Sequence, residues 1–520
     1  MLASPSSLDK AITNNAMSTL RAQNRSFDKN IPLILRPLIR AYLLGYASST
    51  GPRLLTLCLV HLSRRRKNID ERLDEYFLSS FLKILRGGLE LQRFPTFCAA
   101  LVGGSTFLQA RDVFSLDQIL LGCIPIREIL GKLAHKLSDR TQLRLTRFLS
   151  AFISAWFSLK LLQSRQSKTF TEVIPHETQN GDIEFRPTRF AGRTMDLTLF
   201  AVTRAADVVV GELWARHKAS RVGKGKWSKV CMPNGQIQLT RIEQTISTLT
   251  DPTVFAFSCA LIMWSFIYTP ARLPLAYTKW IHSFARVDRR LLITLRRCRY
   301  GELKYGVETG QAPLLQDMCR DYNLPLEFGD PVKSIPFPCE LVHMGCGRSC
   351  EWHAIVRFAR SWVCALKMYA PLNLLLILRH PNRKSLLKSL RSSLRSSTFL
   401  ATFIALYWYG ICLTRTRLGP QILGRTPHAA QALDSGYAIA MGSALCGWSV
   451  LLEGGRKRMD MGLFVAPRAL ATLLPRRYEE KWEWRENVAF AVGTGVLVVG
   501  VGEGRVRGVL GRVLGGVLGG

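Results

Sequence analysis

One stretch of the chain is written twice, and this duplication constrains the fold more than any other feature. The first copy runs from 193 to 205 and the second from 457 to 469. Each copy has a basic residue, then one acidic residue, then an apolar run that contains a single arginine. The identical positions are Met195 and Met459, Asp196 and Asp460, Leu199 and Leu463, Phe200 and Phe464, Arg204 and Arg468, and Ala205 and Ala469. Such long-range similarity predicts a repeated structural unit.

Further matches occur in the same order on both sides of this stretch. Residues 82–89 resemble 387–394, and residues 152–162 resemble 441–452. Chance would not preserve the order of several such matches. We therefore predict two homologous halves.

Apolar runs alternate with segments rich in arginine and lysine along the whole chain. A helix that crosses a bilayer needs about 20 apolar residues, and somewhat shorter runs can suffice. Candidate spans are 94–108, 148–163, 195–211, 253–269, 356–378, 398–414, 434–452, 460–475 and 486–503. Together they predict an all-α, polytopic helical membrane protein with two halves of about four to five helices each. The alternative is a soluble helical bundle, which should show amphipathic stripes and a more acidic surface.

The same pattern divides the chain into five parts. We expect a flexible N-terminal segment at 1–30, a first membrane repeat at 31–284, a linker at 285–337, a second membrane repeat at 338–503 and a Gly-rich tail at 504–520. An odd number of crossings per half would make the halves inverted-topology repeats, as in many transporters. An even number would make them parallel.

The formal net charge of +34 calls for an anionic partner. Basic pairs stand at the ends of apolar runs, as at Arg289-Arg290 and Arg476-Arg477. That placement is typical of contacts with anionic lipid headgroups. No zinc-finger, RNP or helix-turn-helix pattern is present, so we expect a lipid bilayer as the partner and no nucleic acid.

The second half opens with a cluster of cysteines and histidines. Its members are Cys339, His343, Cys346, Cys350 and His353. Spacings of three and four would place all five on one helical face, and thiolate with imidazole suits zinc. Gly345 and Gly347 argue against a regular helix. Metal binding, reactive thiols and simple packing all remain open, so zinc is the one cofactor that we consider.

The repeated polar residues Asp196, Arg204, Asp460 and Arg468 form a second candidate site. In one interpretation each aspartate interacts with a helix dipole and each arginine snorkels or pairs between helices. In the other, the two pairs line a path for a polar or anionic solute. No Walker loop, G-x-S-x-G or H-E-x-x-H motif occurs, and we therefore predict that the protein is not an enzyme.

Several of these residues together resemble a known family. The resemblance is carried in the second half by Pro338, Cys339, Glu340, His343, Cys350, Lys367, Tyr369, Pro371, Tyr407 and Glu453. In the first half it is carried by Arg272, Pro274, Tyr277 and Trp280. This pattern is similar to the transmembrane protein 135 family. The resemblance covers most of 32–503 and is strongest at 338–475. Cys346 and the Gly-rich tail depart from the family pattern.

The resemblance implies a membrane protein of peroxisomes, or alternatively of mitochondria, with a part in lipid metabolism and organelle dynamics. It also implies a distant similarity to the Tim-type translocases and carries over no catalytic residue. Three hypotheses follow. The protein transports a lipid or metabolite, or it is a scaffold that binds anionic lipid or organelle membrane proteins, or it is a metal or thiol enzyme.

Overall fold

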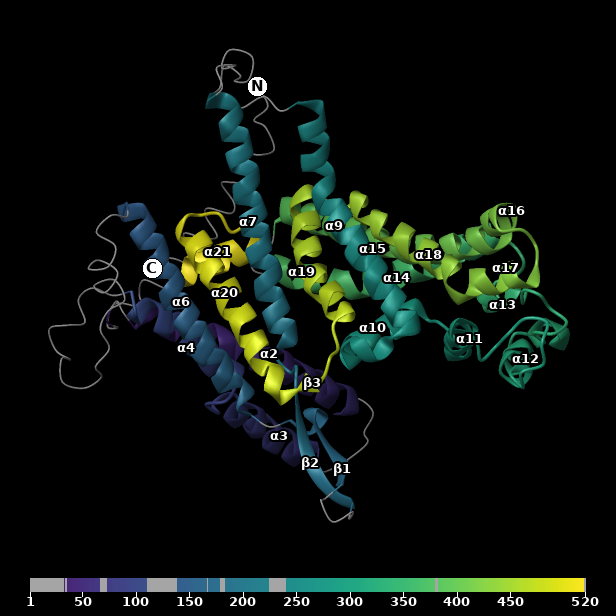
Figure 1. Cartoon of the computed structure of the whole chain (residues 1–520), viewed down its shortest axis with the longest axis horizontal. Helices are drawn as coiled ribbons and strands as arrows, with labels where there is room; N and C mark the ends of the chain where they lie inside the picture. Colours follow the sequence, from purple (N-terminus) through teal and green to yellow (C-terminus); the bar gives the residue numbers. More distant parts are fainter. Residues whose placement is uncertain are drawn as a thin grey trace. The chain divides into compact units, whose positions relative to one another are not determined.

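The computed structural model describes residues 32, 35–65, 73–109, 138–165, 167–177, 183–223, 240–378 and 382–518. The N-terminal segment 1–30 lies outside the described residues. The described chain is nearly all helix, as predicted (Figure 1). It divides into two compact units: unit 1 comprises Met1–Leu213 with Glu479–Gly520, and unit 2 comprises Trp214–Tyr478.

Unit 1 is a helical bundle with one small sheet. Its helices are α2 (Arg36–Arg65), α3 (Leu73–Gly88), α4 (Phe94–Phe107), α6 (Asp139–Gln163), the first part of α7 (Met195–Gly223), α20 (Glu483–Gly502) and α21 (Gly508–Leu518), with the short η3 (Lys168–Phe170) and η9 (Glu480–Trp482). The tail therefore contains a helix, because apolar residues recur at helical spacing within Gly508–Leu518.

The core of unit 1 lies between α4, α6, α7 and α20. Phe97, Leu159, Ala201 and Phe490 come from these four helices and are all buried in one cluster. Glycine permits the close approach of α20 to α6, since a Cβ at Gly495 would lie 2.7 Å from the ring of Phe148. Small residues at helix interfaces are typical of membrane bundles.

A β-hairpin interrupts the helices of unit 1. Strands β1 (Thr171–Glu177) and β2 (Ile183–Ala191) pair antiparallel, with Thr171 opposite Arg189 and Glu177 opposite Ile183. The sheet order is β1-β2-β3, where β3 (Tyr478–Glu479) stands where the chain returns to unit 1. The sequence analysis did not predict these strands, because each contains a proline, Pro175 or Pro187, and a proline within a run argues against a strand.

Among its described residues, unit 2 has helices as its regular structure, apart from Tyr478 of β3. They are α9 (Arg241–Tyr268), η4 (Pro270–Arg272), α10 (Leu275–Ala285), α11 (Arg289–Tyr300), α12 (Ala312–Asp321), η5 (Leu326–Gly329), α13 (Cys339–His343), α14 (Cys350–Leu378), α15 (Arg383–Leu413), η6 (Thr414–Leu418), α16 (Gly419–Ile422), α17 (Pro427–Ala432), η7 (Leu433–Tyr437), α18 (Ala438–Cys446), η8 (Gly447–Leu452) and α19 (Gly455–Leu473). The segments η6 and η7 are π-helical turns within longer helices.

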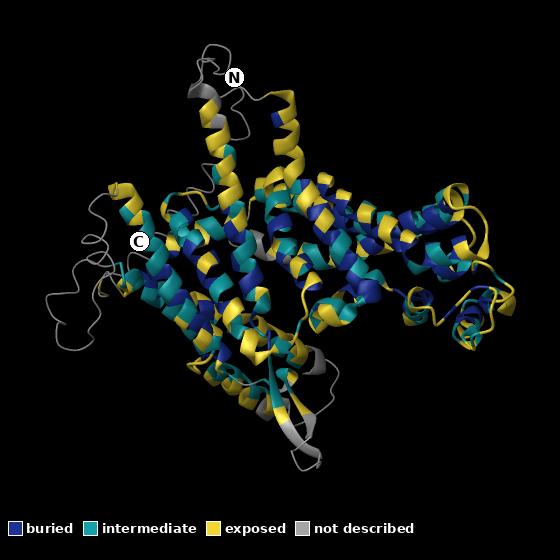
Figure 2. Ribbon diagram, in the orientation of Figure 1, coloured by how far each residue is buried: buried dark blue, intermediate teal, exposed yellow. Residues whose placement is uncertain are grey.

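The segment 285–337, which the sequence suggested as a linker, is packed into the core of unit 2. Leu291 and Leu295 of α11 and Leu315 of α12 are fully or almost fully buried. They share one cluster with Trp408 of α15 and Ile439 of α18. The helices of 285–337 are too short and too polar to be predicted as membrane spans from the sequence. Their apolar faces nevertheless contribute buried residues to the core (Figure 2).

Five described helices are long and apolar enough to cross a membrane. They are Asp139–Gln163, Arg241–Tyr268, Arg383–Ile422, Pro427–Leu452 and Glu480–Gly502. Each covers one of the predicted spans to within one residue, whereas the predicted span 94–108 corresponds to the shorter apolar helix Phe94–Phe107. The predicted spans in α7, α14 and α19 are helical but do not meet the same criterion of length and apolarity.

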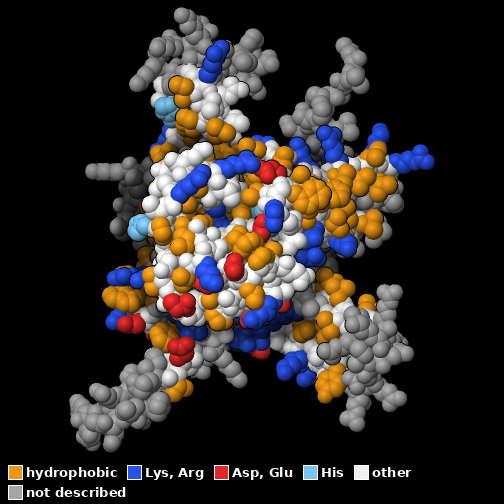
Figure 3. All heavy atoms as spheres, turned by 90° about the vertical axis from the view of Figure 1, so that its right-hand side faces the viewer, with side chains coloured by type: hydrophobic (Ala, Val, Ile, Leu, Met, Phe, Trp, Pro, Cys, Tyr) orange, Lys and Arg blue, Asp and Glu red, His pale blue; other side chains and the backbone are white. Residues whose placement is uncertain are grey.

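Apolar side chains on several helices point away from their own unit. Phe157 on α6 and Phe257 on α9 are 67% and 65% exposed. Figure 3 shows groups of exposed hydrophobic side chains with Lys and Arg between them. Single exposed apolar residues are normal on soluble proteins, but many on helices of spanning length favour a lipid-facing surface.

The last predicted span of each half belongs to the unit that the other half forms. Helix α9, which covers the predicted span up to Tyr268, packs against α18 and α19 in unit 2. Helix α20, which contains 486–502, packs against α6 and shares a core with α7 in unit 1. Contact units and sequence halves therefore have different boundaries.

Candidate metal centre

Four side chains of unit 2 bring their ligand atoms together. Cys339 and His343 stand on α13, Cys350 begins α14, and Cys412 lies near the end of α15. All four ligand atoms lie within 4.8 Å of one another. The Sγ atom of Cys339 is 3.5 Å from that of Cys412 and 3.8 Å from that of Cys350.

A tight reversal of the chain places Cys350 beside α13. Cys339 and His343 are four residues apart, so one helical turn puts both on the same face. Met344, Gly345 and Gly347 then adopt positive φ values of 51°, 79° and 88°. Glycine takes such values without strain, and the chain turns back so that α14 starts next to α13.

Histidine 343 is oriented as a metal ligand requires. Its Nδ1 lies 2.7 Å from the carbonyl oxygen of Gly347, and its Nε2 lies 3.5 Å from the Sγ of Cys412. A proton on Nδ1 would be donated to that carbonyl, which leaves the Nε2 lone pair for a metal. Backbone carbonyls hold many zinc-binding histidines in this way.

In the metal-free state His343 would hold a proton. Burial lowers its pKa, but hydrogen bonds with Cys339 and with the carbonyl of Gly347 outweigh burial and raise the pKa to about 9. A metal must displace this proton, together with those of the thiols, before it binds. Metal affinity should therefore fall as the pH falls.

Histidine 353 lies beside the four residues without belonging to the cluster. Its Nε2 accepts a hydrogen bond of 3.1 Å from Nε of Arg357, and its Nδ1 lies 3.9 Å from the Sγ of Cys412. Burial and the charges of His343, Arg357 and Arg360 lower the pKa of His353 to about 3. A neutral His353 that accepts at Nε2 carries its proton on Nδ1, which faces the sulfur.

The donor set and its geometry fit zinc. A Cys3His set is a common structural zinc site, and Zn–S bonds of about 2.3 Å in a tetrahedron place the sulfurs about 3.8 Å apart. The two S–S distances of 3.5 and 3.8 Å agree with that value. Four protein ligands leave no position for a substrate, and His343 and Cys412 are fully buried. Such a closed site stabilises a fold instead of performing catalysis.

The cluster differs from the set that the sequence suggested, because it lacks Cys346 and His353 and includes Cys412. Cys346 stands on the turn between the two positive-φ glycines, and its sulfur accepts from Arg360 at 3.8 Å. The helix that would have aligned all five residues is broken there, so Cys346 points elsewhere. Cys412, which the sequence placed among the apolar residues of a span, supplies the fourth ligand. No local spacing signals a ligand that lies 62 residues beyond Cys350.

A buried ion pair links the two ligand segments. Nε of Arg415 donates to Asp434 Oδ1 at 2.5 Å, and Nη2 of Arg415 donates to Asp434 Oδ2 at 3.0 Å and to the carbonyl of Phe337 at 2.9 Å. The Tyr305 hydroxyl donates to Asp434 at 2.5 Å. Arg415 follows Cys412 by three residues and Phe337 precedes Cys339 by two, so this pair fixes both segments beside the cluster.

The repeated Asp and Arg residues occupy different environments in the two copies. Arg204 is buried, and its guanidinium stacks over the ring of Phe200. Arg468 is partly exposed; its guanidinium stacks over the ring of Phe464 and donates a hydrogen bond of 2.6 Å to the carbonyl of that residue. Asp196 lies in the first turn of α7, and Asp460 lies one turn deeper in α19. The pairs belong to different units. A common solute path therefore stays a prediction.

The remaining candidate site residues, Lys367, Tyr369 and Pro371, lie on α14. Lys367 and Pro371 are exposed, and Tyr369 packs against the cluster that contains Phe255 and Phe399. Pro371 lies inside the helix, where its missing N–H interrupts the hydrogen-bond ladder. These three positions make no contact with the metal cluster that would give them a chemical role.

Comparisons with protein-family models, with curated proteins and with solved structures found no match to this chain.

Proposed function

We propose that this chain is an integral membrane protein whose unit 2 is held together by a structural zinc ion. The Cys3His cluster carries the proposal, because Cys412 of α15 joins the three ligands of 339–350 across a long stretch of sequence, with the spacing that zinc requires. The helices of spanning length and their exposed apolar side chains support the membrane assignment.

Zinc analysis of cysteine variants tests this proposal. We expect purified full-length protein to contain one zinc per chain and Cys412→Ser to lose it, because serine cannot replace the thiolate. Cys346→Ser should keep its zinc, although the sequence alone grouped Cys346 with the ligands. Cys446→Ser is a matched control, since Cys446 is a fully buried thiol outside the cluster. Metal-free wild-type protein, or zinc that survives in Cys412→Ser, would contradict the proposal.

For the cell, we propose the setting that the resemblance to the transmembrane protein 135 family implies. The protein would reside in the peroxisomal membrane, or alternatively the mitochondrial membrane, and would transport or handle a lipid or metabolite. Its basic segments would contact anionic headgroups, and organelle membrane proteins would be its partners. Imaging a tagged chain with peroxisomal and mitochondrial markers, after carbonate extraction of membranes, tests this. A nuclear or extractable protein would refute it.

We further propose that the two halves are structural repeats that exchange their last helices. Aligning residue 251 with 486 pairs two acidic residues and also pairs Phe255 with Phe490. Each of these phenylalanines contacts an aromatic ring of the other sequence half: the ring centroid of Phe255 is 5.9 Å from that of Phe399, and that of Phe490 is 5.8 Å from that of Phe97. The same role at the same aligned position supports a duplicated unit.

A further inference from the structure

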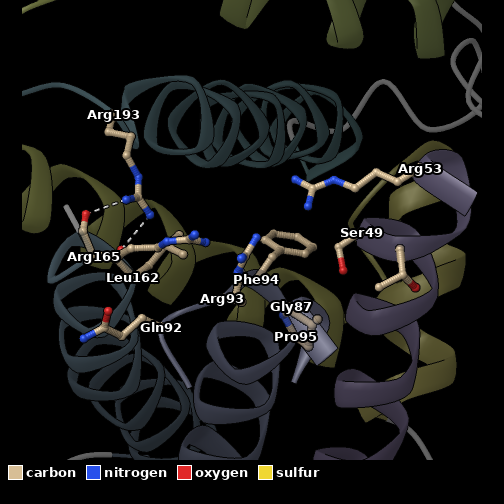
Figure 4. A pocket seen from close by; sticks show the side chains of 12 residues that line it. Ser49, Arg53, Gly87, Gln92, Arg93, Phe94, Pro95, Leu162, Arg165 and Arg193 are labelled. Atoms are coloured by element: carbon tan, nitrogen blue, oxygen red, sulfur yellow. Dashed lines mark hydrogen bonds between the residues drawn. The ribbon is translucent and has the colours of Figure 1, made fainter. Parts of the chain in front are cut away.

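A small open pocket in unit 1 is lined mainly by arginine, hydroxyl and small side chains. Its volume is about 180 Å³, which equals the liquid volume of about six waters. Its lining residues come from α2, from the end of α3, from the start of α4 with the turn before it, from the end of α6 and from the turn before α7. Those that bear on a ligand are Arg53, Arg93, Phe94, Pro95, Arg165 and Arg193 (Figure 4). All of these elements belong to unit 1.

Positive charge exceeds negative charge around this pocket. Glu90 lies next to the pocket and pairs with Arg93 at 2.9 Å and with Arg165 at 3.7 Å. Arg53 is exposed, and among the described residues it forms no ion pair. Burial, together with the charges of Arg165, Arg189 and Arg93, lowers the pKa of Arg193. One carboxylate therefore balances four guanidinium groups only in part.

Two of the arginines are held in place before any ligand arrives. Arg193 donates to the carbonyls of Arg165, at 2.5 Å, and of Leu162, at 2.9 Å, which are orphan acceptors at the end of α6. Arg93 makes a two-pronged contact with Glu90. Figure 4 shows Arg53 reaching toward Arg93 and Phe94 from the opposite side. Capping of the end of α6 explains the position of Arg193 only. It does not explain why Arg53, Arg93 and Arg165 also line this pocket.

The beginning of α4 adds backbone donors on the same side. Phe94 and Pro95, the first two residues of this 14-residue helix, line the pocket. No side chain caps the N-terminus of α4, because Arg93 in the N-cap position makes no capping hydrogen bond. Pro95 has no N–H, so the remaining uncapped N–H groups of the first turn, together with the helix dipole, favour an anion there.

We propose that this pocket binds a phosphate group, supplied either by a phospholipid headgroup or by a free phosphate compound. Planar guanidinium groups match the oxygens of phosphate in pairs, and the helix N-terminus offers further donors. The pocket lies at the end of α6, one of the helices of spanning length, where headgroups meet a transmembrane helix. This binding site is independent of the zinc in unit 2.

Isothermal titration of the full-length protein in neutral detergent tests the proposal. The probes are sodium phosphate and a short-chain phosphatidic acid, with short-chain diacylglycerol as a lipid that lacks the phosphate. We expect Arg53→Gln and Arg165→Gln each to weaken binding about tenfold, the usual effect of losing a charge-assisted hydrogen bond. Arg140→Gln is the matched control, because Arg140 is exposed in the first turn of α6, at the opposite end of the helix from the pocket.

The outcomes separate the two sources of phosphate. Binding of phosphatidic acid alone identifies a lipid headgroup, and binding of both probes or of free phosphate alone identifies a site open to soluble phosphate compounds. Unchanged melting temperature and zinc content show that the variants are folded. The proposal is overturned if neither probe binds, if diacylglycerol binds as well as phosphatidic acid, or if Arg140→Gln weakens binding as much as Arg53→Gln.

Discussion

At the scale of single residues, the Arg415–Asp434 pair is the most consequential contact of unit 2. Both side chains are almost completely buried, at 3% and 1% exposure. Each lies in a helix of spanning length, where an unpaired charge is costly. Their mutual hydrogen bonds, with those from Tyr305 and to Phe337, satisfy most of the polar atoms involved.

We predict that Asp434→Ala destabilises the protein by about 3–5 kcal/mol, because it leaves the guanidinium buried without its partner. Thermal unfolding in detergent measures the effect. Glu302→Ala is the control, since Glu302 is 60% exposed and pairs with Arg297 at 3.7 Å. Exposed pairs contribute about 0–1 kcal/mol. If Asp434→Ala and Glu302→Ala lost the same amount of unfolding free energy, Arg415 and Asp434 would not be buried together.

At the scale of elements, glycines set how closely α15 and α18 approach. A Cβ on Gly442 would lie 2.5 Å from the carbonyl oxygen of Tyr407, and one on Gly410 would lie 2.9 Å from the Cα of Gly442. The two helices therefore pack backbone against backbone, as small residues allow in membrane bundles. Cys412 lies on this same part of α15, so the packing also fixes the position of a metal ligand.

Gly442→Ala should cost about 1–3 kcal/mol, the usual penalty for forcing extra volume into a packed interface. It should also weaken zinc binding, which a chelator competition measures, because α15 must move away from α18. Gly455→Ala provides the comparison, since a Cβ there meets nothing within 4 Å. A variant Gly442→Ala with wild-type stability and zinc affinity would refute the close contact.

At the scale of the whole molecule, each unit depends on a helix from the far end of the other sequence half. Helix α20 contributes Phe490 to the core of unit 1 that contains Phe97 and Leu159, and α9 contributes Phe266 to the core of unit 2. Such an exchange makes the stability of each unit depend on both halves of the sequence.

We predict that deletion of 479–520 disrupts unit 1 and leaves the zinc of unit 2 in place. Unit 1 would lose the side chains of α20 that bury α6 and α7, while every ligand and its neighbours lie within Trp214–Tyr478. Limited proteolysis should then cleave before residue 213, and metal analysis should still find one zinc per chain. Deletion of 505–520, which spares α20, should leave unit 1 largely resistant. Loss of zinc in the longer deletion would argue against this division.

The sequence by itself determined the features that depend on near neighbours. Apolar runs of sufficient length predicted the long helices, because the length and composition of a run are enough to indicate a helix that can cross a bilayer. Cys339, His343 and Cys350 could be identified as candidate ligands because a single turn and one reversal bring them together. The hairpin at 171–191 was not predicted, because Pro175 and Pro187 lie within its strands and proline in a run argues against a strand.

Tertiary structure alone decided the features that join distant segments. In the sequence, the fourth ligand, Cys412, is indistinguishable from the other small apolar residues of its span. Only the packing of α15 beside α14 brings its sulfur to the other three ligands. Cys346 lies outside the cluster, because the chain turns at Gly345 and Gly347, which have positive φ values. The convergence of Arg53, Arg93, Arg165 and Arg193 likewise depends on four separate elements. Local spacing carries no information about such contacts, since they depend on how whole helices pack.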